Sequence, residues 1–323
     1  MKPINMTLFI TALLILPACE YKELENIEDQ GRFRCQVLFN YQNIDSIPAT
    51  MRVAFYPIDH ETYSNMTKGY ITFDIPATGG NVSLPVGNYK VVAWNSDTEH
   101  VTVTDNDNPY DLAANAVQYS PADILPTRSV EQDVAKLIDS IYKGQSLYTF
   151  PDYMIHATGQ VSVFSNAENQ VTLTPDSMVS HVQLNIHGIQ GLPYVSDMQG
   201  TIDGTMSTRF IAFDKLSQNP AVTLFSPTYN EETVTASFYV FDFEPGKTNF
   251  KIILFCWMSD KKIYLTLNID EDNASITREE NGNIIINIDI SVDIRNFIGN
   301  NEGGFNISLD DWDDHIIDVD IQF

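Results

Sequence analysis

The stretch at residues 81–95, NVSLPVGNYKVVAWN, decides the fold class. Apolar and polar residues alternate before a central turn, at Val82 and Leu84, and a mostly apolar run from Tyr89 to Trp94 follows the turn; both patterns are typical of strands. In the turn, Pro85 presets the backbone angle φ, and Gly87 allows angles that other residues avoid. The segment therefore predicts a β-hairpin: a strand, a turn at residues 85–88, and a second strand that runs through Trp94.

The same alternation recurs on both sides of this hairpin. Near the start of the chain, Phe33, Cys35, Val37 and Phe39 fall on one face of a predicted strand. Many short strands separated by turns are typical of β-sandwiches rather than of parallel sheets, so the expected fold class is all-β. Further strands are predicted at residues 51–57, 70–76, 160–164, 170–175, 181–188, 237–258, 262–270, 283–294 and 315–323.

One short helix is predicted among the strands, at residues 129–144. Ser129 and Gln132 form a capping box at its start, and Gly144 is a typical stop. The apolar residues of this segment form a single stripe, which predicts that the helix packs on a sheet. Before it, residues 105–129 carry no regular pattern. They are expected to form a long loop that either faces a ligand or covers the domain.

A turn signal at Pro175-Asp176 divides the strands into two groups. The turn at residues 243–246 has a strand on each side, as the hairpin turn does, and this similarity suggests two related domains. A chain of 323 residues is long enough for both. We therefore expect an N-terminal β-sandwich domain at residues 31–175 and a C-terminal β-sandwich domain at residues 176–323.

The chain is strongly acidic, with 43 Asp and Glu residues against 18 Lys and Arg and a net charge of −25. Such a charge repels phosphate backbones, so nucleic acid is not an expected partner. Two cysteines, Cys35 and Cys256, lie far apart in apolar, strand-like sequence. They are expected to be buried free thiols, and the alternative is a disulfide between them.

The N-terminal residues have the composition of a secretory signal. Lys2 provides a positive start, and the apolar run from Met6 to Ala18 is shorter than the roughly 20 residues of a membrane-spanning helix. A short apolar run that closes on a small residue is typical of a signal peptide. We place this signal peptide at residues 1–18.

The end of the signal, Leu16-Pro17-Ala18 followed by Cys19, resembles the lipobox of bacterial lipoproteins. The resemblance implies that the Cys19 thiol carries a lipid and that the mature chain begins there, attached to a membrane. The alternative is an ordinary signal peptide with a chance cysteine nearby. Residues 19–30 are rich in Glu and predict a mobile acidic tether. This tether is either a plain spacer or, as in lipoproteins of some Gram-negative anaerobes that it resembles, a surface-export signal.

The sequence contains no recognisable catalytic, metal or cofactor motif. His181 and His187 alternate with apolar residues and are expected on a solvated strand face rather than at a zinc site. We therefore predict no enzymatic activity, no catalytic residue, no metal site and no cofactor. Abundant carboxylates leave a hydrolase with an acidic pair as a remaining alternative. Trp312 lies among four aspartates and is a candidate for stacking on a ligand, the alternative being a structural role.

The lipobox, the acidic tether, the LPVGNYKVVAWN hairpin, the segment PYVSDMQGTIDGTMS and the terminal GGFNISLDDWDDHIIDVDIQF together resemble fimbrillin-type surface lipoproteins of Gram-negative anaerobes. The resemblance covers nearly the whole mature chain. It implies two tandem transthyretin-like Greek-key β-sandwiches, lipid attachment to the outer membrane and a cell-surface location. It also implies a role as a fimbrial anchor, tip or adhesin-like subunit, with fimbrial subunits or a host or bacterial surface ligand as partners.

Polymerising members of that family exchange strands between subunits, and the C-terminus of this chain has a strand pattern. Ile317, Val319, Ile321 and Phe323 fall on one face. Either this strand completes its own sandwich, or it is donated to the open sheet edge of a partner. The alternative function for the whole chain is a surface glycan-binding lipoprotein of a nutrient-capture system.

Overall fold

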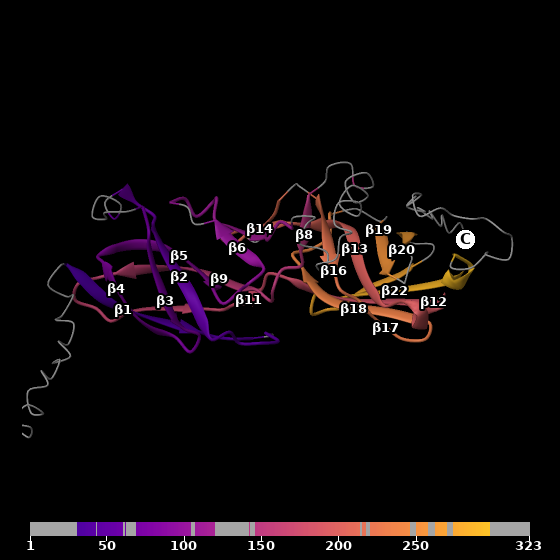
Figure 1. The fold of residues 1–323 in the computed structure, drawn as a ribbon. Helices are drawn as coiled ribbons and strands as arrows, with labels where there is room; N and C mark the ends of the chain where they lie inside the picture. The colour runs from indigo at the N-terminus through magenta and orange to yellow at the C-terminus, as the bar shows by residue number, and fades with distance from the viewer. Residues whose placement is uncertain are drawn as a thin grey trace, which may run out of the picture.

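The computed structural model describes residues 31–297, apart from residues 43, 61, 63–68, 105–106, 120–141, 143–145, 214, 218–219, 246–249, 258–261 and 270–273. The described chain is built almost entirely of strands and is elongated, with its N-terminal strands at one end and its C-terminal strands at the other (Figure 1). The all-β fold class is therefore confirmed. Apart from Tyr142, the predicted helix at residues 129–144 lies outside the described residues.

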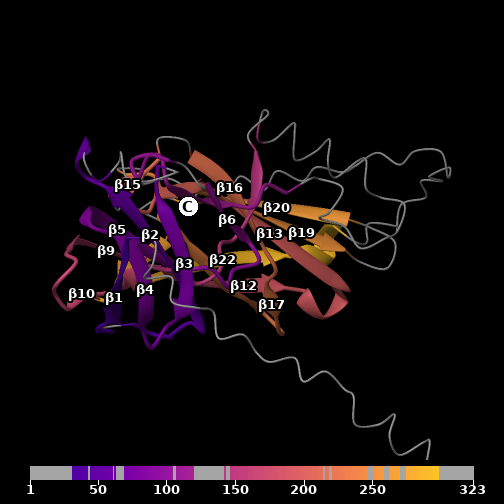
Figure 2. The same ribbon diagram turned by 90° about the vertical axis from the view of Figure 1, so that its left-hand side faces the viewer.

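The N-terminal half is a sandwich of two sheets, which Figure 2 shows one above the other. The smaller sheet has the order β10-β1-β4, and the larger has the order β11-β9-β5-β2-β3. Alternation along β1 buries Cys35 and Val37 between the sheets. The bounds are β1 Arg32–Phe39, β2 Thr50–Pro57, β3 Ile71–Pro76, β4 Gly80–Pro85, β5 Gly87–Asn95, β9 Ile155–Val163, β10 Asn169–Leu173 and β11 Asp176–Ser177.

The predicted hairpin at residues 81–95 is correct in its strands and wrong in its pairing. β4 pairs with β1 in the smaller sheet, whereas β5 pairs with β2 and β9 in the larger one. The turn therefore carries the chain from one layer to the other. The Tyr89 hydroxyl donates a hydrogen bond to the Pro85 carbonyl across this turn, at 3.0 Å.

The C-terminal half is a second sandwich, with sheet orders β17-β18-β12-β22-β21 and β20-β19-β13-β16-β8. Val182, Leu184 and Ile186 of β12 are completely buried in its core. The bounds are β8 Leu147–Thr149, β12 Ser180–Gln190, β13 Asp197–Met206, β16 Pro220–Phe225, β17 Thr228–Tyr229, β18 Thr233–Val240, β19 Phe250–Trp257, β20 Lys262–Ile269, β21 Ala274–Arg278 and β22 Ile284–Asp293, with 3-10 turns at Leu192–Tyr194 and Ile294–Phe297.

The two halves share one topological feature. β1 pairs in parallel with β10, and β12 pairs in parallel with β22. In each half, an early strand therefore lies beside a late one, with the chain returning in the same direction. This repetition agrees with two related sandwiches.

A fifth sheet, which we call the joining sheet, connects the halves in the order β15-β14-β7-β6. β6 and β7 come from the N-terminal half, and β14 and β15 come from the C-terminal half. Because β7 falls inside residues 105–129, the expectation of a continuous long loop there is wrong. The bounds are β6 Val101–Thr104, β7 Ala113–Ala116, β14 Thr208–Phe210 and β15 Lys215–Leu216.

A separate apolar core lies under this joining sheet. It contains Trp94 and Leu112 from the N-terminal half and Met178 and Phe241 from the C-terminal half, each at most 2 % exposed. Burying such large side chains stabilises the contact through the hydrophobic effect. The division at residue 175 stays a prediction, and strand pairing crosses it at β14–β7 and at β16–β8.

Candidate functional site

The sequence-predicted site residues lie outside the described part of the chain. These residues are the lipid-attachment residue Cys19, the C-terminal strand residues Ile317, Val319, Ile321 and Phe323, and Trp312. Their roles therefore stay predictions.

Two other expectations are confirmed. Cys35 and Cys256 are free and buried, and burial raises the pKa of Cys35 to about 11 and that of Cys256 to about 12. His181 lies on a solvated strand face, where its Nε2 is 2.7 Å from Oγ of Ser237 on the neighbouring strand.

The passage of the chain between the two sandwiches forms the candidate site. The chain leaves β8 in a C-terminal sheet and enters β9 in an N-terminal sheet, so residues 150–154 run from one half to the other. We call these residues the crossing. Beside them lies a pocket of about 310 Å³, the junction pocket, which is lined by Ser46, Pro48, Asn95, Asp97, Glu99, Asp152 and Tyr153.

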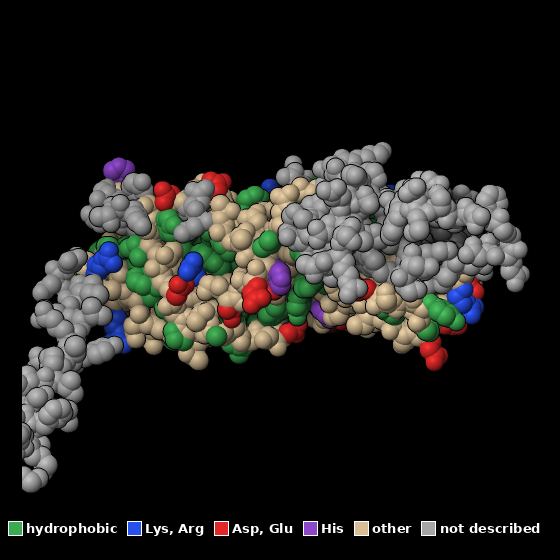
Figure 3. All heavy atoms as spheres, in the orientation of Figure 1, with side chains coloured by type: hydrophobic (Ala, Val, Ile, Leu, Met, Phe, Trp, Pro, Cys, Tyr) green, Lys and Arg blue, Asp and Glu red, His purple; other side chains and the backbone are tan. Residues whose placement is uncertain are grey.

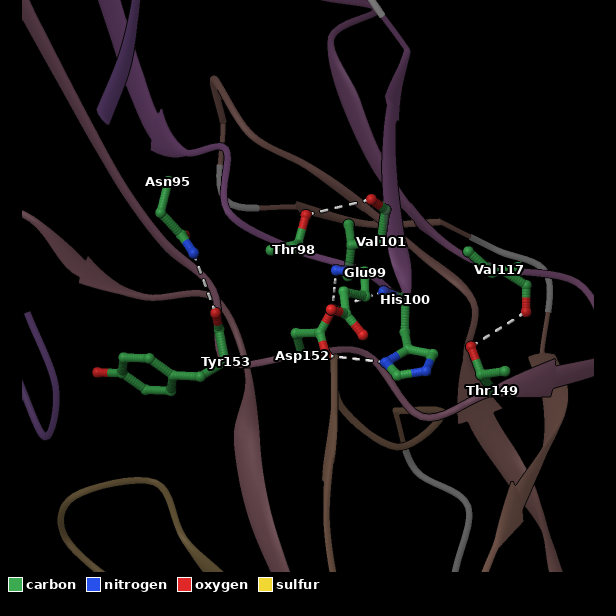
Figure 4. A network of polar contacts seen from close by, with 9 residues as sticks. All are labelled: Asn95, Thr98, Glu99, His100, Val101, Val117, Thr149, Asp152 and Tyr153. Atoms are coloured by element: carbon green, nitrogen blue, oxygen red, sulfur yellow. Dashed lines mark hydrogen bonds and ion pairs between the residues drawn. The ribbon is translucent and has the colours of Figure 1, made fainter. Parts of the chain in front are cut away.

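Asp152 is the centre of a polar network in the crossing (Figure 4). Its Oδ2 accepts hydrogen bonds from the backbone N–H groups of Glu99 and His100, both at 2.6 Å. Its Oδ1 lies 2.9 Å from Nδ1 of His100. These contacts fasten the loop between β5 and β6 to the crossing.

The protonation state of Asp152 follows from the same contacts. Burial acts to raise its pKa, but the hydrogen bonds from His100 and Glu99 outweigh burial, so the pKa lies below its ordinary value. A carboxyl group with a depressed pKa is a poor proton donor near neutral pH. Asp152 is therefore suited to hold the loop as a charged acceptor rather than to act as a general acid.

Asn95, which ends β5, fixes the other side of the crossing and is only 4 % exposed. Its Nδ2 donates to the Tyr153 carbonyl at 3.1 Å, and its Oδ1 accepts from the Ile155 N–H at 2.8 Å. Its amide also donates to Asp97 Oδ1 at 3.1 Å. The Asn95 side chain therefore bonds to the backbone on both sides of the point where the crossing becomes β9.

Two carboxylates of the junction pocket, those of Asp97 and Asp152, have structural partners. Besides the contact with Asn95, Asp97 accepts a hydrogen bond from the Ala49 N–H at 3.3 Å. Asp97, Glu99 and Asp152 together give the pocket a negative field, which disfavours anionic ligands. Across residues 31–297, with the stated gaps, no group of three or more His, Cys, Asp and Glu side chains is arranged to hold a metal ion.

A second feature, which the sequence patterns do not indicate, is an exposed aromatic pair. Tyr110 and Phe213 stack with ring centroids 4.5 Å apart and planes inclined by 15°, and they are 62 % and 42 % exposed. The ammonium of Lys90 lies 4.1 Å from the Phe213 centroid, within range of a cation–π interaction. One ring comes from each half of the chain, and both residues lie in turns whose sequence has no periodic pattern of apolar residues. No local pattern could therefore have paired them.

Comparison with known proteins assigns the chain to a family. The model of the family described as Domain of unknown function (DUF5119) matches residues 18–226, which is well over half of the chain. The chain belongs to this family. A search of curated proteins finds no match.

Solved structures with a similar fold include a protein from Bacteroides ovatus described as a candidate adhesin. It is 17 % identical with a TM-score of 0.57, and the alignment covers 82 % of this chain and 94 % of that one. At this identity the likeness shows the fold alone. It confirms the fimbrillin-type resemblance at the level of a β-sandwich fold. Within the described residues, none of the helices has the length and apolarity to span a bilayer.

Two further solved structures align with lower TM-scores. One is described as candidate polysaccharide-binding proteins from Bacteroides thetaiotaomicron, at 14 % identity and a TM-score of 0.49, covering 80 % of this chain and 92 % of that one. The other is the fimbrial anchor protein Mfa2 from Porphyromonas gingivalis, at 12 % identity and a TM-score of 0.44, covering 74 % of this chain and 82 % of that one.

Proposed function

We propose that this chain is a lipid-anchored cell-surface protein of the outer membrane that works by binding, as a fimbrial anchor, tip or adhesin-like subunit. The observation that carries the proposal is the likeness of its fold to the Bacteroides ovatus candidate adhesin over 94 % of that protein. The lipobox-like residues before Cys19 supply the means of attachment. The proposal involves no catalytic step.

The arrangement of the two sandwiches supports an anchored role. The described chain starts with β1 at one end of the molecule, and the second sandwich lies at the opposite end (Figure 1). The crossing, the joining sheet and the core beneath it connect the two halves through backbone pairing and buried side chains. A lipid on Cys19 would therefore hold the first sandwich near the bilayer and present the second one away from it.

Membrane attachment is tested by replacing Cys19 with alanine. The wild-type chain should begin at an acylated Cys19 by mass spectrometry and fractionate with membranes, and Cys19→Ala should be released. An unmodified thiol in the membrane-bound wild type, or full retention of the variant, contradicts the proposal.

Partner binding is tested by purifying the native protein and identifying fimbrial components that accompany it. Deletion of residues 316–323 then separates the two roles of the C-terminal strand. A folded product that loses the partner supports strand donation, and an unfolded product supports self-completion.

A second candidate function, glycan binding, is favoured by the exposed Tyr110–Phe213 pair, because aromatic faces stack on sugar rings. Tyr110→Ala and Phe213→Ala should each weaken binding to a surface polysaccharide, with Tyr194→Ala as the control, since Tyr194 is also 62 % exposed but lies apart from the pair. Equal affinities of all three variants for every polysaccharide tested contradict this function.

A further inference from the structure

The end of the N-terminal sandwich exposes a group of apolar side chains. Ile58, Val86 and Phe164 are 54 %, 42 % and 58 % exposed, and they are three of the seven large hydrophobic residues that are most exposed in the described chain. Single exposed hydrophobic residues are normal, whereas a group of them at one place marks a surface for interaction. We call these three residues the apolar tip.

Strand pairing places the three residues together. Gly87 of β5 pairs with Val163 of β9, so Val86 and Phe164 lie at adjacent strand ends. The Ile58 N–H donates to the Asn88 carbonyl at 2.9 Å, which places Ile58 on the other side of β5. Since neighbouring strands are about 4.8 Å apart and Ile58 lies two residues along the strand from the level of Val86, the three backbone positions fall within about 12 Å of one another.

The chain enters the described structure at this same end. Arg32, the first residue of β1, pairs with Pro85, which directly precedes Val86. About a dozen residues separate Cys19 from Arg32, and even a fully extended chain of that length reaches only about 40 Å. A lipid at Cys19 therefore keeps the apolar tip within this distance of the bilayer, whereas the second sandwich lies at the far end of the molecule (Figure 1).

The charge of this end also differs from that of the whole chain. Among the described residues at the tip, Arg32 and Arg34 offset Asp59 and Glu168, in a chain with a net charge of −25. Basic side chains are visible at this end in Figure 3, on the left. Anionic lipids repel acidic surfaces and attract basic ones. The described residues of the tip are therefore near neutral in charge, and other acidic residues of the chain at this end lie in the tether at residues 19–30.

We infer that the apolar tip docks on the phospholipid surface to which the chain is anchored, with Ile58, Val86 and Phe164 inserted at the headgroup boundary. This inference rests on the lipid attachment of Cys19 in the proposed function. Insertion of apolar side chains at the interface adds to the hold of the acyl chains and orients the domain. The docked protein would stand with its second sandwich directed away from the membrane.

The test uses the full lipidated protein, reconstituted in vesicles of phosphatidylethanolamine and phosphatidylglycerol. An environment-sensitive fluorophore is placed at Phe164→Cys and, as the matched control, at Tyr194→Cys, which replaces an exposed aromatic residue of the second sandwich. The buried thiols of Cys35 and Cys256 will not take the label. A nitroxide-bearing lipid should quench the label at position 164 and shift its emission to shorter wavelength, with no change at position 194.

A further variant tests whether the apolar side chains cause the docking. Val86→Asp, on an exposed position, leaves the fold intact and should reduce the quenching of a label at position 164. If the label at 164 remains in water while the protein is bound to vesicles, the docking inference is wrong and the anchor stands. If the label is already shielded without vesicles, a second copy covers the tip, which also overturns lipid docking.

Failure of the proposed function has a different signature. In that case Cys19 itself takes the fluorophore, as mass spectrometry of the N-terminal peptide would show, and the protein does not float with the vesicles. That result would overturn both the anchor and the docking inference. The two failures are therefore distinguishable in one preparation.

Discussion

Replacement of Asp152 by alanine should destabilise the whole described fold, because this residue ties the crossing to the β5–β6 loop. The variant removes an anionic acceptor from two backbone N–H groups at 2.6 Å and from the His100 ring at 2.9 Å. A hydrogen bond to a charged group contributes about 1.5–3 kcal/mol, and the Asp152 side chain is 29 % exposed, so water can partly replace it. We expect a loss of about 2–3 kcal/mol in the free energy of unfolding.

Urea unfolding followed by far-UV circular dichroism measures this loss. The matched control is Asp289→Ala, which removes a carboxylate from an exposed position of β22. Surface substitutions of this kind change stability by no more than about 0.5 kcal/mol. If Asp152→Ala is as stable as the control, the crossing is not held by this network.

The pH dependence gives a second check on the same residue. The pKa of Asp152 is lower in the folded protein than in the unfolded chain, where it is about 3.9. Its contribution is therefore fully present above the unfolded value and is lost as the pH falls through the folded value. The gap in stability between the wild type and Asp152→Ala should therefore shrink below about pH 4. A gap that stays the same down to acid unfolding refutes the charged-acceptor role.

Two further predictions concern backbone and thiol positions. Gly188→Ala should lower the free energy of unfolding in urea by well over ~3 kcal/mol, because φ is +88° and the added Cβ would meet the Ile290 carbonyl oxygen. The control is Gly282→Ala, at φ +86°, where the added Cβ meets nothing within 4 Å. It should lower the free energy of unfolding by only about 1 kcal/mol. Equal losses would contradict this difference. Cys35 and Cys256 should be inert to a thiol reagent near pH 8 in the folded protein and react in urea, since burial raises their pKa to about 11 and about 12. Rapid reaction without urea would show that they are accessible.

The sandwich strands could be predicted because their signal is local. Alternation in β1 and β12 places apolar residues on one face, and burial of Val37 and Leu184 follows directly from it. The pairing of strands is a different matter. The turn at Val86-Gly87 suits a hairpin and a passage between layers equally well, so the residues of the turn do not distinguish them. Only the partners of β4 and β5 elsewhere in the chain decide between the two.

The junction could not be predicted from sequence for a physical reason. β7 and β14 are four and three residues long and carry no alternation, and they pair across more than ninety positions, Thr208 with Asn115. Asp152 lies in a Pro-Asp-Tyr segment that resembles an ordinary turn. Its partners are backbone groups about fifty residues away. Nothing in the identity of Glu99 or His100 indicates that their N–H groups need an acceptor.

The junction also determines what the two sandwiches can do together. Two domains joined only by a linker reorient freely, because no backbone hydrogen bond opposes their separation. Here β7 pairs with β14, so separating the halves would break this ladder and expose the core around Phe241. The broken ladder would leave N–H and C=O groups without partners, which is costly where they are buried. The direction of the second sandwich relative to β1 is therefore fixed by the fold, because the joined halves cannot reorient without breaking this pairing.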